Sequence, residues 1–284
     1  MTTLRDNAQA HLMRLETAVA PVELAQPNQA SITLDDFDRL LDYTDFCVLH
    51  DTRGQNANLA FLCLKGPQEA VASNGSIAVH ISRDVGEPSF EKSVLLGFES
   101  LPLLRAMAEE TTLTYKERDG KALFTAANHS WSAQGVLRSS LEMPLGTSPY
   151  PNLTSLFQRP HKNAISVEVT ALKAILEAEQ NKICTTSTPL IELTVGNNKV
   201  TVRREYLEGV LSAVEEKDIY ICEVCEDNCP DCQEPSECSH EVEISLTGKN
   251  NGTLSIVAVD HETGFEVRYL IMPTVSPCLH LRLL

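Results

Sequence analysis

The sequence lacks long apolar runs and is poor in basic residues. No stretch approaches the roughly 20 apolar residues of a membrane-spanning helix, and residues 1–6 lack the apolar core of a signal peptide. We therefore expect a soluble, cytoplasmic protein with no membrane partner. Lysine and arginine number 23 against 39 aspartates and glutamates, for a net charge of −16. This balance argues against a protein that coats nucleic acid by bulk attraction, although it allows a local basic surface.

Motifs of common catalytic sites are also missing. The sequence contains no Gly-x-x-x-x-Gly-Lys phosphate loop, no Gly-x-Ser-x-Gly nucleophile turn and no His-Glu-x-x-His metal motif. Histidines such as His50, His80, His129 and His161 show no ligand spacing, so structural roles are expected for them. The sequence therefore predicts a protein that is not an enzyme.

Cysteines are present and clustered. Five of the nine fall in one short segment, at Cys222, Cys225, Cys229, Cys232 and Cys238. Two Cys-x-x-Cys pairs can present four thiolates to a tetrahedral zinc ion, and Cys238 or His240 could serve as a further ligand. Because only three residues separate the pairs, Cys238 could replace Cys222 or Cys229. Structural zinc is the first prediction, ahead of free or redox-active thiols and an iron–sulfur cluster.

The clearest periodic pattern lies near the C-terminus. Val242, Ile244 and Leu246 alternate with polar residues, which is typical of a half-buried strand. Upstream, apolar residues recur at helical spacing from Tyr206, so a helix is available to cover these strands. A helix followed by returning strands is therefore the expected unit.

The same unit recurs four times. Its first strands begin at Ser31, Ser93, Ile165 and Lys199. Asp35 or Asp36 is expected to cap the first helix, and Ser100 the second. The returning strands of the first three units are expected at residues 60–65, 69–73 and 77–82, then 112–115, 122–126 and 132–137, and then 190–195.

Paired units indicate an α+β protein with two domains of ordinary size. A stretch rich in proline, asparagine, threonine and serine provides the connector between them. The predicted division is residues 1–30 as an N-terminal tail or helix, 31–150 as domain one, 151–162 as connector, 163–276 as domain two with a cysteine-rich insertion at 222–240, and 277–284 as a C-terminal tail.

Four segments, taken in order and at their intervals, resemble landmarks of a known family. They are Ala70-Val-Ala-Ser-Asn-Gly75, Pro149-Tyr-Pro-Asn-Leu-Thr-Ser-Leu156, the helix start Tyr206-Leu207 and Tyr269-Leu-Ile-Met-Pro273. The ordered set resembles the bacterial DNA polymerase III beta sliding clamp over roughly residues 31 to 275. The likeness covers the second and third of that family's three domains, so the chain resembles a compact variant of the kind that a virus or mobile element could encode.

The resemblance implies the DNA-clamp fold and a closed ring around double-stranded DNA, with helices lining the hole. Because such a ring contains six similar domains, a two-domain chain implies a homotrimer with head-to-tail contacts. The expected partners are DNA, a DNA polymerase and a clamp-loader ATPase. The resemblance places basic residues of the inner helices against DNA, namely Arg39, Arg105, Lys173, Lys182, Arg203 and Arg204. The alternative is that these are ordinary solvated helix charges.

The family also has an interdomain cleft that receives peptide tails of replication proteins. By position, the matching residues are Ser73, Gly75, Pro151, Leu156, Tyr206, Met272 and Pro273. The chain departs from the family at two places: Asn74-Gly-Ser-Ile77 stands where Asp-Gly-His-Arg is usual, and Arg203 replaces an asparagine. A cleft is therefore expected, but not the family's partner preference. The alternative is that Met272 and Tyr206 belong only to the core.

These observations predict a sliding clamp that acts as a polymerase processivity factor and recruits polymerase through the interdomain cleft. Two alternatives from other classes remain. One is a clamp-like adaptor or regulator that binds replication proteins without encircling DNA. The other is a zinc-dependent enzyme built on the same scaffold.

Overall fold

The structure is a computed structural model. It describes residues 32–53, 56–83, 90, 92–108, 112–118, 120–128, 137–147, 149–159, 162–178, 189–215, 241–247 and 252–274. The chain divides into residues 1–30 and 31–284, and every described residue belongs to the second part. The prediction for residues 1–30 and the tail at 277–284 therefore lies outside the described residues.

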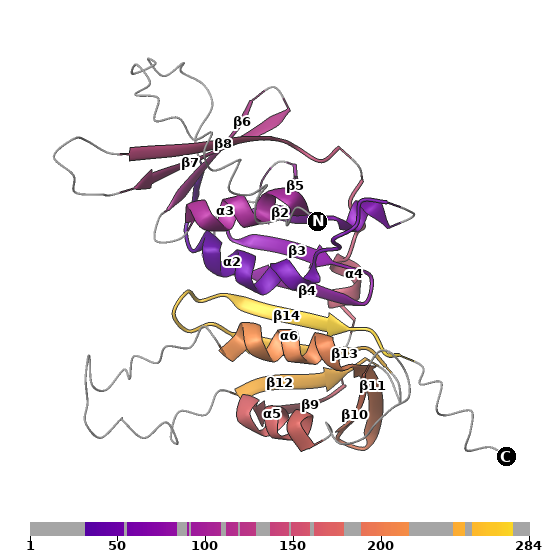
Figure 1. The fold of residues 1–284 in the computed structure, drawn as a ribbon. Coiled ribbons are helices and arrows are strands. Elements are labelled where there is room, and N and C mark those ends of the chain that lie inside the picture. Colours follow the sequence, from indigo (N-terminus) through magenta and orange to yellow (C-terminus); the bar gives the residue numbers. More distant parts are fainter. Residues whose placement is uncertain are drawn as a thin grey trace, which may run out of the picture. The chain divides into compact units, whose positions relative to one another are not determined.

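One antiparallel sheet of eight strands organises the described chain (Figure 1). Its spatial order is β5-β2-β3-β4-β14-β13-β12-β9, so the first four strands come from the first half of the chain and the last four from the second half. The bounds are β5 Val94–Gly97, β2 Phe61–Gly66, β3 Glu69–Ser73, β4 Ile77–Ser82, β14 Glu266–Ile271, β13 Leu254–Val259, β12 Glu241–Leu246 and β9 Lys162–Glu168.

The two halves join through backbone pairing at the centre of this sheet. Strand β4 pairs with β14 over its whole length, from Ile77 opposite Ile271 to Ser82 opposite Glu266. The predicted two-domain division stays a prediction, but the sheet runs through the predicted boundary without a break.

Four helices cover one face of the sheet in the order α3, α2, α6, α5 (Figure 1). Their bounds are α2 Phe37–Thr44, α3 Leu101–Ala108, α5 Val169–Ala178 and α6 Arg204–Glu215. Alternate strand residues such as Ile77, Val79 and Ile81 are fully buried beneath them. The apolar residues that recur at helical spacing and those that alternate along the strands are thus buried together in one core.

Each half carries a second, smaller sheet. In the first half its order is β1-β6-β7-β8, with β1 Ile32–Leu34, β6 Leu113–Arg118, β7 Lys121–Asn128 and β8 Leu137–Pro144. In the second half the described residues form only a hairpin of β10 Leu190–Val195 and β11 Asn198–Arg203. The four predicted units are confirmed, and within the described residues the third has a single returning strand.

Two local predictions, both of helix caps, were wrong. The Asp36 side chain makes no capping bond to α2 and instead pairs with Arg83, while its backbone sits in the left-handed region at φ 52°. The Ser100 hydroxyl donates to the Gly97 carbonyl oxygen at 2.6 Å rather than capping α3. For Asp36 and Ser100, a contact made by the folded chain overrode a local preference. The last described strand of the second unit is β8, residues 137–144, and residues 132–136 of the predicted strand lie outside the described residues.

Candidate functional site

A small apolar cluster lies on the sheet face opposite the helices, at the junction of the two halves. Alternation along β4 turns Ala78 away from the helix-covered core. There it is buried with neighbours from β3, β14 and the connector. The cluster consists of buried Val71, Ala78, Phe157 and Leu270, with Tyr150, Leu153 and Leu156 packed on it. We call this set the seam cluster.

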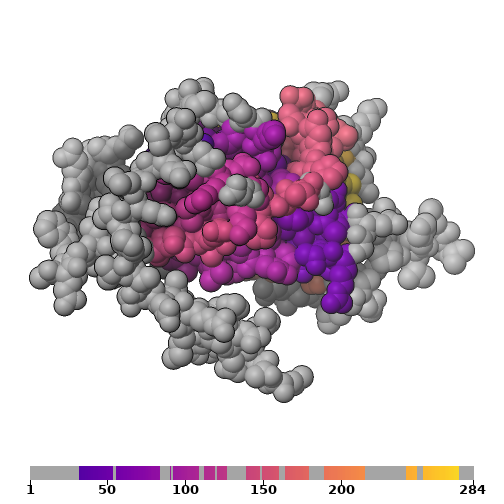
Figure 2. Space-filling view, turned by 90° about the horizontal axis from the view of Figure 1, so that it is seen from above, coloured from indigo at the N-terminus to yellow at the C-terminus, as the bar shows by residue number. Residues whose placement is uncertain are grey.

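The connector, residues 149–159, is attached to the sheet by polar bonds as well. It includes the short helix α4, Thr154–Phe157. The Lys65 ammonium donates to Thr154 Oγ1 at 3.0 Å, and Arg268 Nη1 donates to the Phe157 carbonyl oxygen at 3.3 Å. The His80 ring lies 5.4 Å from the Phe157 ring. The space-filling view shows the connector, in salmon, on the surface against residues coloured indigo to violet (Figure 2).

The hairpin between β3 and β4 lies at one end of the seam cluster. Gly75 has φ +91°, which is readily adopted only by glycine. The Ser73 hydroxyl accepts from Gly75 N at 3.1 Å and donates to the Ile77 carbonyl oxygen at 2.9 Å. The Met272 N–H donates to the Ser76 carbonyl oxygen at 2.8 Å. The structure thus brings the predicted cleft residues Ser73, Gly75 and Met272 together, with Met272 and Pro273 half-buried.

The other predicted cleft residues are placed differently. Leu156 packs on the seam cluster, and Pro151 lines a neighbouring pocket. Tyr206 packs against the main core at the start of α6, with the Arg203 guanidinium 5.8 Å from its ring centre. Tyr206 thus contacts the core, and its role in a cleft stays a prediction.

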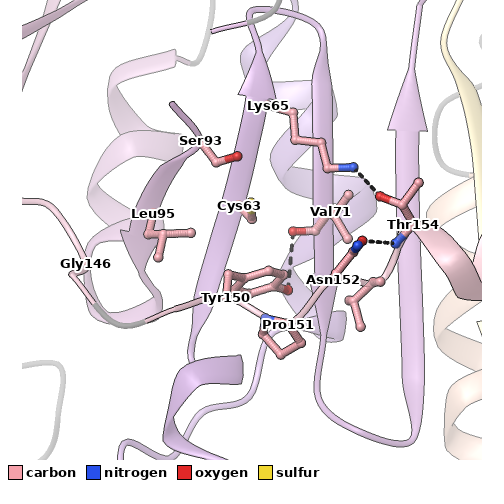
Figure 3. A pocket seen from close by; sticks show the side chains of 11 residues that line it. Cys63, Lys65, Val71, Ser93, Leu95, Gly146, Tyr150, Pro151, Asn152 and Thr154 are labelled. Carbon is pink, nitrogen blue, oxygen red and sulfur yellow. Dashed lines mark hydrogen bonds between the residues drawn. The ribbon is translucent and has the colours of Figure 1, made fainter. Parts of the chain in front are cut away.

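The pocket next to the seam has a volume of about 380 Å³ (Figure 3). Its floor comes from Ser93 and strands β2, β3 and β5, and its roof from Gly146 and residues 150–154. The lining residues are Cys63, Lys65, Val71, Ser93, Leu95, Gly146, Tyr150, Pro151, Asn152, Leu153 and Thr154. We call it the arch pocket, because the chain above it is attached at both ends.

One attachment is at Gly146, whose N–H donates to the Leu95 carbonyl oxygen at 3.0 Å. A Cβ at Gly146 would come within 2.7 Å of Phe61 Cε1, so only glycine allows this close approach. The other attachment is the Lys65–Thr154 bond. Tyr150 adds a long bond of 3.5 Å from its hydroxyl to the Val71 carbonyl oxygen, and burial raises the pKa of this tyrosine.

Sequence reasoning missed Lys65, Phe157 and Arg268. Lys65 was detectable in part, because on β2 it alternates with buried Leu62 and Leu64 and must point away from the core. No sequence pattern near Lys65 indicates that the connector covers the sheet face opposite the helices.

The predicted DNA-facing cations lie on the helices or at their starts, and several are paired with carboxylates. Arg39 contacts Glu262 at 2.5 Å, Arg105 contacts Asp42 at 2.7 Å, and Arg204 contacts Glu208 at 2.6 Å. Arg203 lies 3.4 Å from Glu205. Lys173 is half-buried on α5, and Lys182 lies outside the described residues.

The four helices together are not basic. They carry four cations and six carboxylates: Arg39, Arg105, Lys173 and Arg204 against Asp38, Asp42, Glu177, Glu205, Glu208 and Glu215. The helix row therefore presents no net positive charge to a polyanion.

The five clustered cysteines and His240 lie outside the described residues, so the zinc site stays a prediction. Within the described ranges no group of three or more His, Cys, Asp or Glu side chains could hold a metal ion. No helix in those ranges is long and apolar enough to cross a membrane.

Several solved structures resemble this chain. No protein-family model matches the sequence, and no curated protein does. Structural comparison finds a DNA polymerase III beta subunit from Eubacterium rectale at 11% identity and TM-score 0.62, covering 90% of this chain and 68% of that one. The beta subunit of Streptococcus pyogenes matches at 15% identity and TM-score 0.60, covering 92% and 69%.

The chain has the DNA sliding-clamp fold. The particular proteins that share it are beta subunits of DNA polymerase III, and they include the one from Thermotoga maritima, at 14% identity and TM-score 0.61, with 92% of this chain and 69% of that chain covered. The predicted fold class is confirmed, and so is the resemblance on which it rested.

Proposed function

We propose that the protein is a DNA sliding clamp that acts as a processivity factor for a replicative polymerase. The observation that carries this proposal is the row of four helices on one face of a continuous sheet, within the sliding-clamp fold. A clamp holds DNA by enclosure and needs no catalytic group. A cytoplasmic location and loading by a partner ATPase belong to the same proposal.

The electrostatics of the helix row suit enclosure better than adhesion. Arg39, Arg105 and Arg204 already have carboxylate partners, so phosphates would have to compete for them. Few released counterions mean weak salt dependence of binding. We therefore propose that DNA retention depends on an intact ring and hardly on ionic strength.

Ring closure would use sheet edges that the described chain leaves available. Strand β8 is an edge of its four-stranded sheet, and β10 is an edge of the hairpin in the second half. Edge strands are templates for pairing with another chain. We propose that β8 of one copy lies along β10 of the next, as β4 lies along β14 within the chain, so that three copies close head to tail.

The mass in solution and the retention on circular DNA together test the ring. In solution at micromolar concentration we expect three times the chain mass of 31.3 kDa, measured by sedimentation or light scattering. After loading, the protein should stay on nicked circular DNA at raised salt and leave the same DNA once it is linearised. A monomer that leaves both forms alike would contradict the ring.

That outcome would favour the second candidate, a clamp-like adaptor that binds replication proteins without encircling DNA. The specific observation in its favour is the excess of carboxylates on the helix row. Under this alternative the seam would still bind partner peptides.

We propose that the seam, formed by the hairpin at Gly75, the end of β14 and the connector, receives a peptide tail of the polymerase. Met272→Ala and Leu156→Ala should each weaken binding of that tail by about 1 kcal/mol or more, because each removes a half-buried apolar anchor. Fluorescence anisotropy with a labelled tail of the polymerase from the same genome measures the affinity.

The matched control is Met107→Ala, which removes a half-buried methionine from α3, outside the seam. It should leave the affinity unchanged. Equal affinities for wild type and both seam variants would show that the tail docks elsewhere.

We also propose that the cysteine-rich segment binds one structural zinc ion, since two Cys-x-x-Cys pairs can supply a tetrahedral thiolate site. Elemental analysis of protein purified under reducing conditions should find about one zinc per chain, and Cys225→Ser with Cys232→Ser should remove it. Protein without zinc and with freely titrating thiols would support the alternative of redox-active cysteines.

A further inference from the structure

The arch pocket has a chemistry that the proposed clamp function does not use. Among its lining residues Lys65 is the one charged side chain. The protein as a whole carries a net charge of −16, so a cationic lining is a local exception. The remaining lining combines apolar Val71, Leu95 and Leu153 with the polar ends of Ser93 and Asn152.

The Lys65 ammonium retains capacity for a ligand. It has three N–H donors. Among the described residues its partners are Thr154 Oγ1 at 3.0 Å and the Glu69 carboxylate at 3.5 Å. One donor is left, and it is part of a half-buried side chain at the pocket wall (Figure 3). A carboxylate is the group that completes such a cation most favourably.

Neighbouring donors favour the same group. The Asn152 carboxamide oxygen accepts from Thr154 N at 3.2 Å, which leaves its NH₂ group as a donor. Ser93 and the Cys63 thiol line the floor. Burial raises the pKa of this thiol, so the floor is neutral and does not repel an anion.

The pocket is continuous with the seam cluster. Val71, Tyr150 and Leu153 belong to both. A volume of about 380 Å³ lies at the lower end of the range for ligand pockets and accommodates a group the size of a dipeptide. An extended chain whose apolar side chains lie on the seam can therefore enter the pocket with its end.

We propose that the arch pocket binds the free C-terminal carboxylate of a partner tail, held by Lys65 and Asn152, while apolar side chains of the same tail occupy the seam. This inference rests on the proposed peptide-binding function and adds to it a requirement for a free carboxyl end next to apolar residues.

Two small probes test it on the full chain: N-acetyl-leucyl-leucine as the free acid and as the C-terminal amide. Methyl NMR follows Val71 and Leu95 during titration to 10 mM. We expect both signals to shift, with the acid binding about fivefold more tightly than the amide, since one partly exposed ion pair distinguishes them. The preference should shrink as salt is added.

The variant Lys65→Met should reduce the ratio of the two affinities to about one, because it keeps the apolar stem and removes the charge. Lys116→Met is the matched control: Lys116 is half-buried on β6, outside the pocket, and its loss should leave the ratio unchanged. Thermal unfolding checks that both variants are folded. Equal affinity of acid and amide for wild type, a preference that survives Lys65→Met, or no shift at 10 mM would each overturn the proposal.

The outcomes separate this inference from the seam itself. If Met272→Ala and Leu156→Ala weaken tail binding while the acid shows no advantage, the seam function stands and the pocket proposal fails. If the acid is preferred but neither seam variant matters, the pocket binds carboxylates independently of the proposed partner tail. An N-acetyl-leucine control with the same preference would assign the pocket to small carboxylic acids, and that result would also overturn the requirement for a protein tail.

Discussion

Replacing Tyr269 by alanine is expected to lower the free energy of unfolding by about 3–5 kcal/mol, as for other large aromatic side chains removed from a core. Tyr269 is fully buried on β14, which pairs with β4 where the two halves join. Its ring centre lies 5.7 Å from that of Phe46, and its hydroxyl donates to the Tyr43 carbonyl oxygen at 3.2 Å. The substitution therefore opens a cavity next to Tyr43 and Phe46.

The variant Tyr269→Phe separates the ring from the hydroxyl. It keeps the packing and loses one hydrogen bond, so we expect a cost of about 1 kcal/mol. Urea unfolding followed by circular dichroism measures both values. A loss below 1 kcal/mol for Tyr269→Ala would mean that the halves do not share one core.

Removing the Asp260 carboxylate should be the second large effect. Asp260 is 4% exposed in the turn between β13 and β14. One of its oxygens accepts from the Tyr43 hydroxyl of α2 at 2.9 Å, and the other accepts from the backbone N–H groups of Glu262 at 3.0 Å and Thr263 at 3.2 Å. Asp260→Ala leaves two buried donors and one partly buried donor without their acceptor, and we expect a loss of about 3 kcal/mol.

The same carboxylate makes stability depend on pH. Burial acts to raise its pKa, but the hydrogen bonds from Thr263, Tyr43 and Glu262 outweigh burial, so the folded-state pKa lies below the usual value. A carboxyl group with a lowered folded pKa contributes stability that is fully present above the unfolded pKa, near 3.9, and is lost as pH falls through the folded pKa. The stability difference between wild type and Asp260→Ala should be constant near neutral pH and shrink below about pH 4.

Asp38→Ala provides the control, because Asp38 is an acidic residue of the same helix α2 whose side chain is half-buried. It should change stability by less than about 0.5 kcal/mol, and the pH dependence that comes from Asp260 should remain. Denaturant titrations between pH 3 and pH 7 give both quantities. A difference between wild type and Asp260→Ala that grows on acidification would contradict the assigned pKa direction.

Periodic patterns predicted most elements, because they depend on neighbours a few residues apart. The alternation of Val242, Ile244 and Leu246 became β12, and the helical spacing from Tyr206 became α6, which begins two residues earlier. Capping was harder. Asp36 and Ser100 have side chains suited to capping a helix, but Asp36 pairs with Arg83 and Ser100 bonds the Gly97 carbonyl oxygen instead. Those partners come from the surrounding fold and override the local preference.

The predicted sites divide in the same way. Ser73, Gly75 and Met272 were found from ordered landmarks, and the fold brings them to one place. The predicted DNA-facing arginines lie on the helices or at their starts, but nothing local shows their carboxylate partners, since Arg39 and Glu262 are 223 positions apart.

By itself, the sequence determined the four repeated units, the α+β class and the resemblance to sliding clamps, because side-chain periods and turn residues act over short distances. Only the tertiary structure decided that β4 pairs with β14, so that the two halves form one sheet. It also decided that several cations on the helices pair with carboxylates and that the connector bonds to Lys65. Pairing of distant strands and charges depends on how the whole chain packs, and no local pattern specifies it.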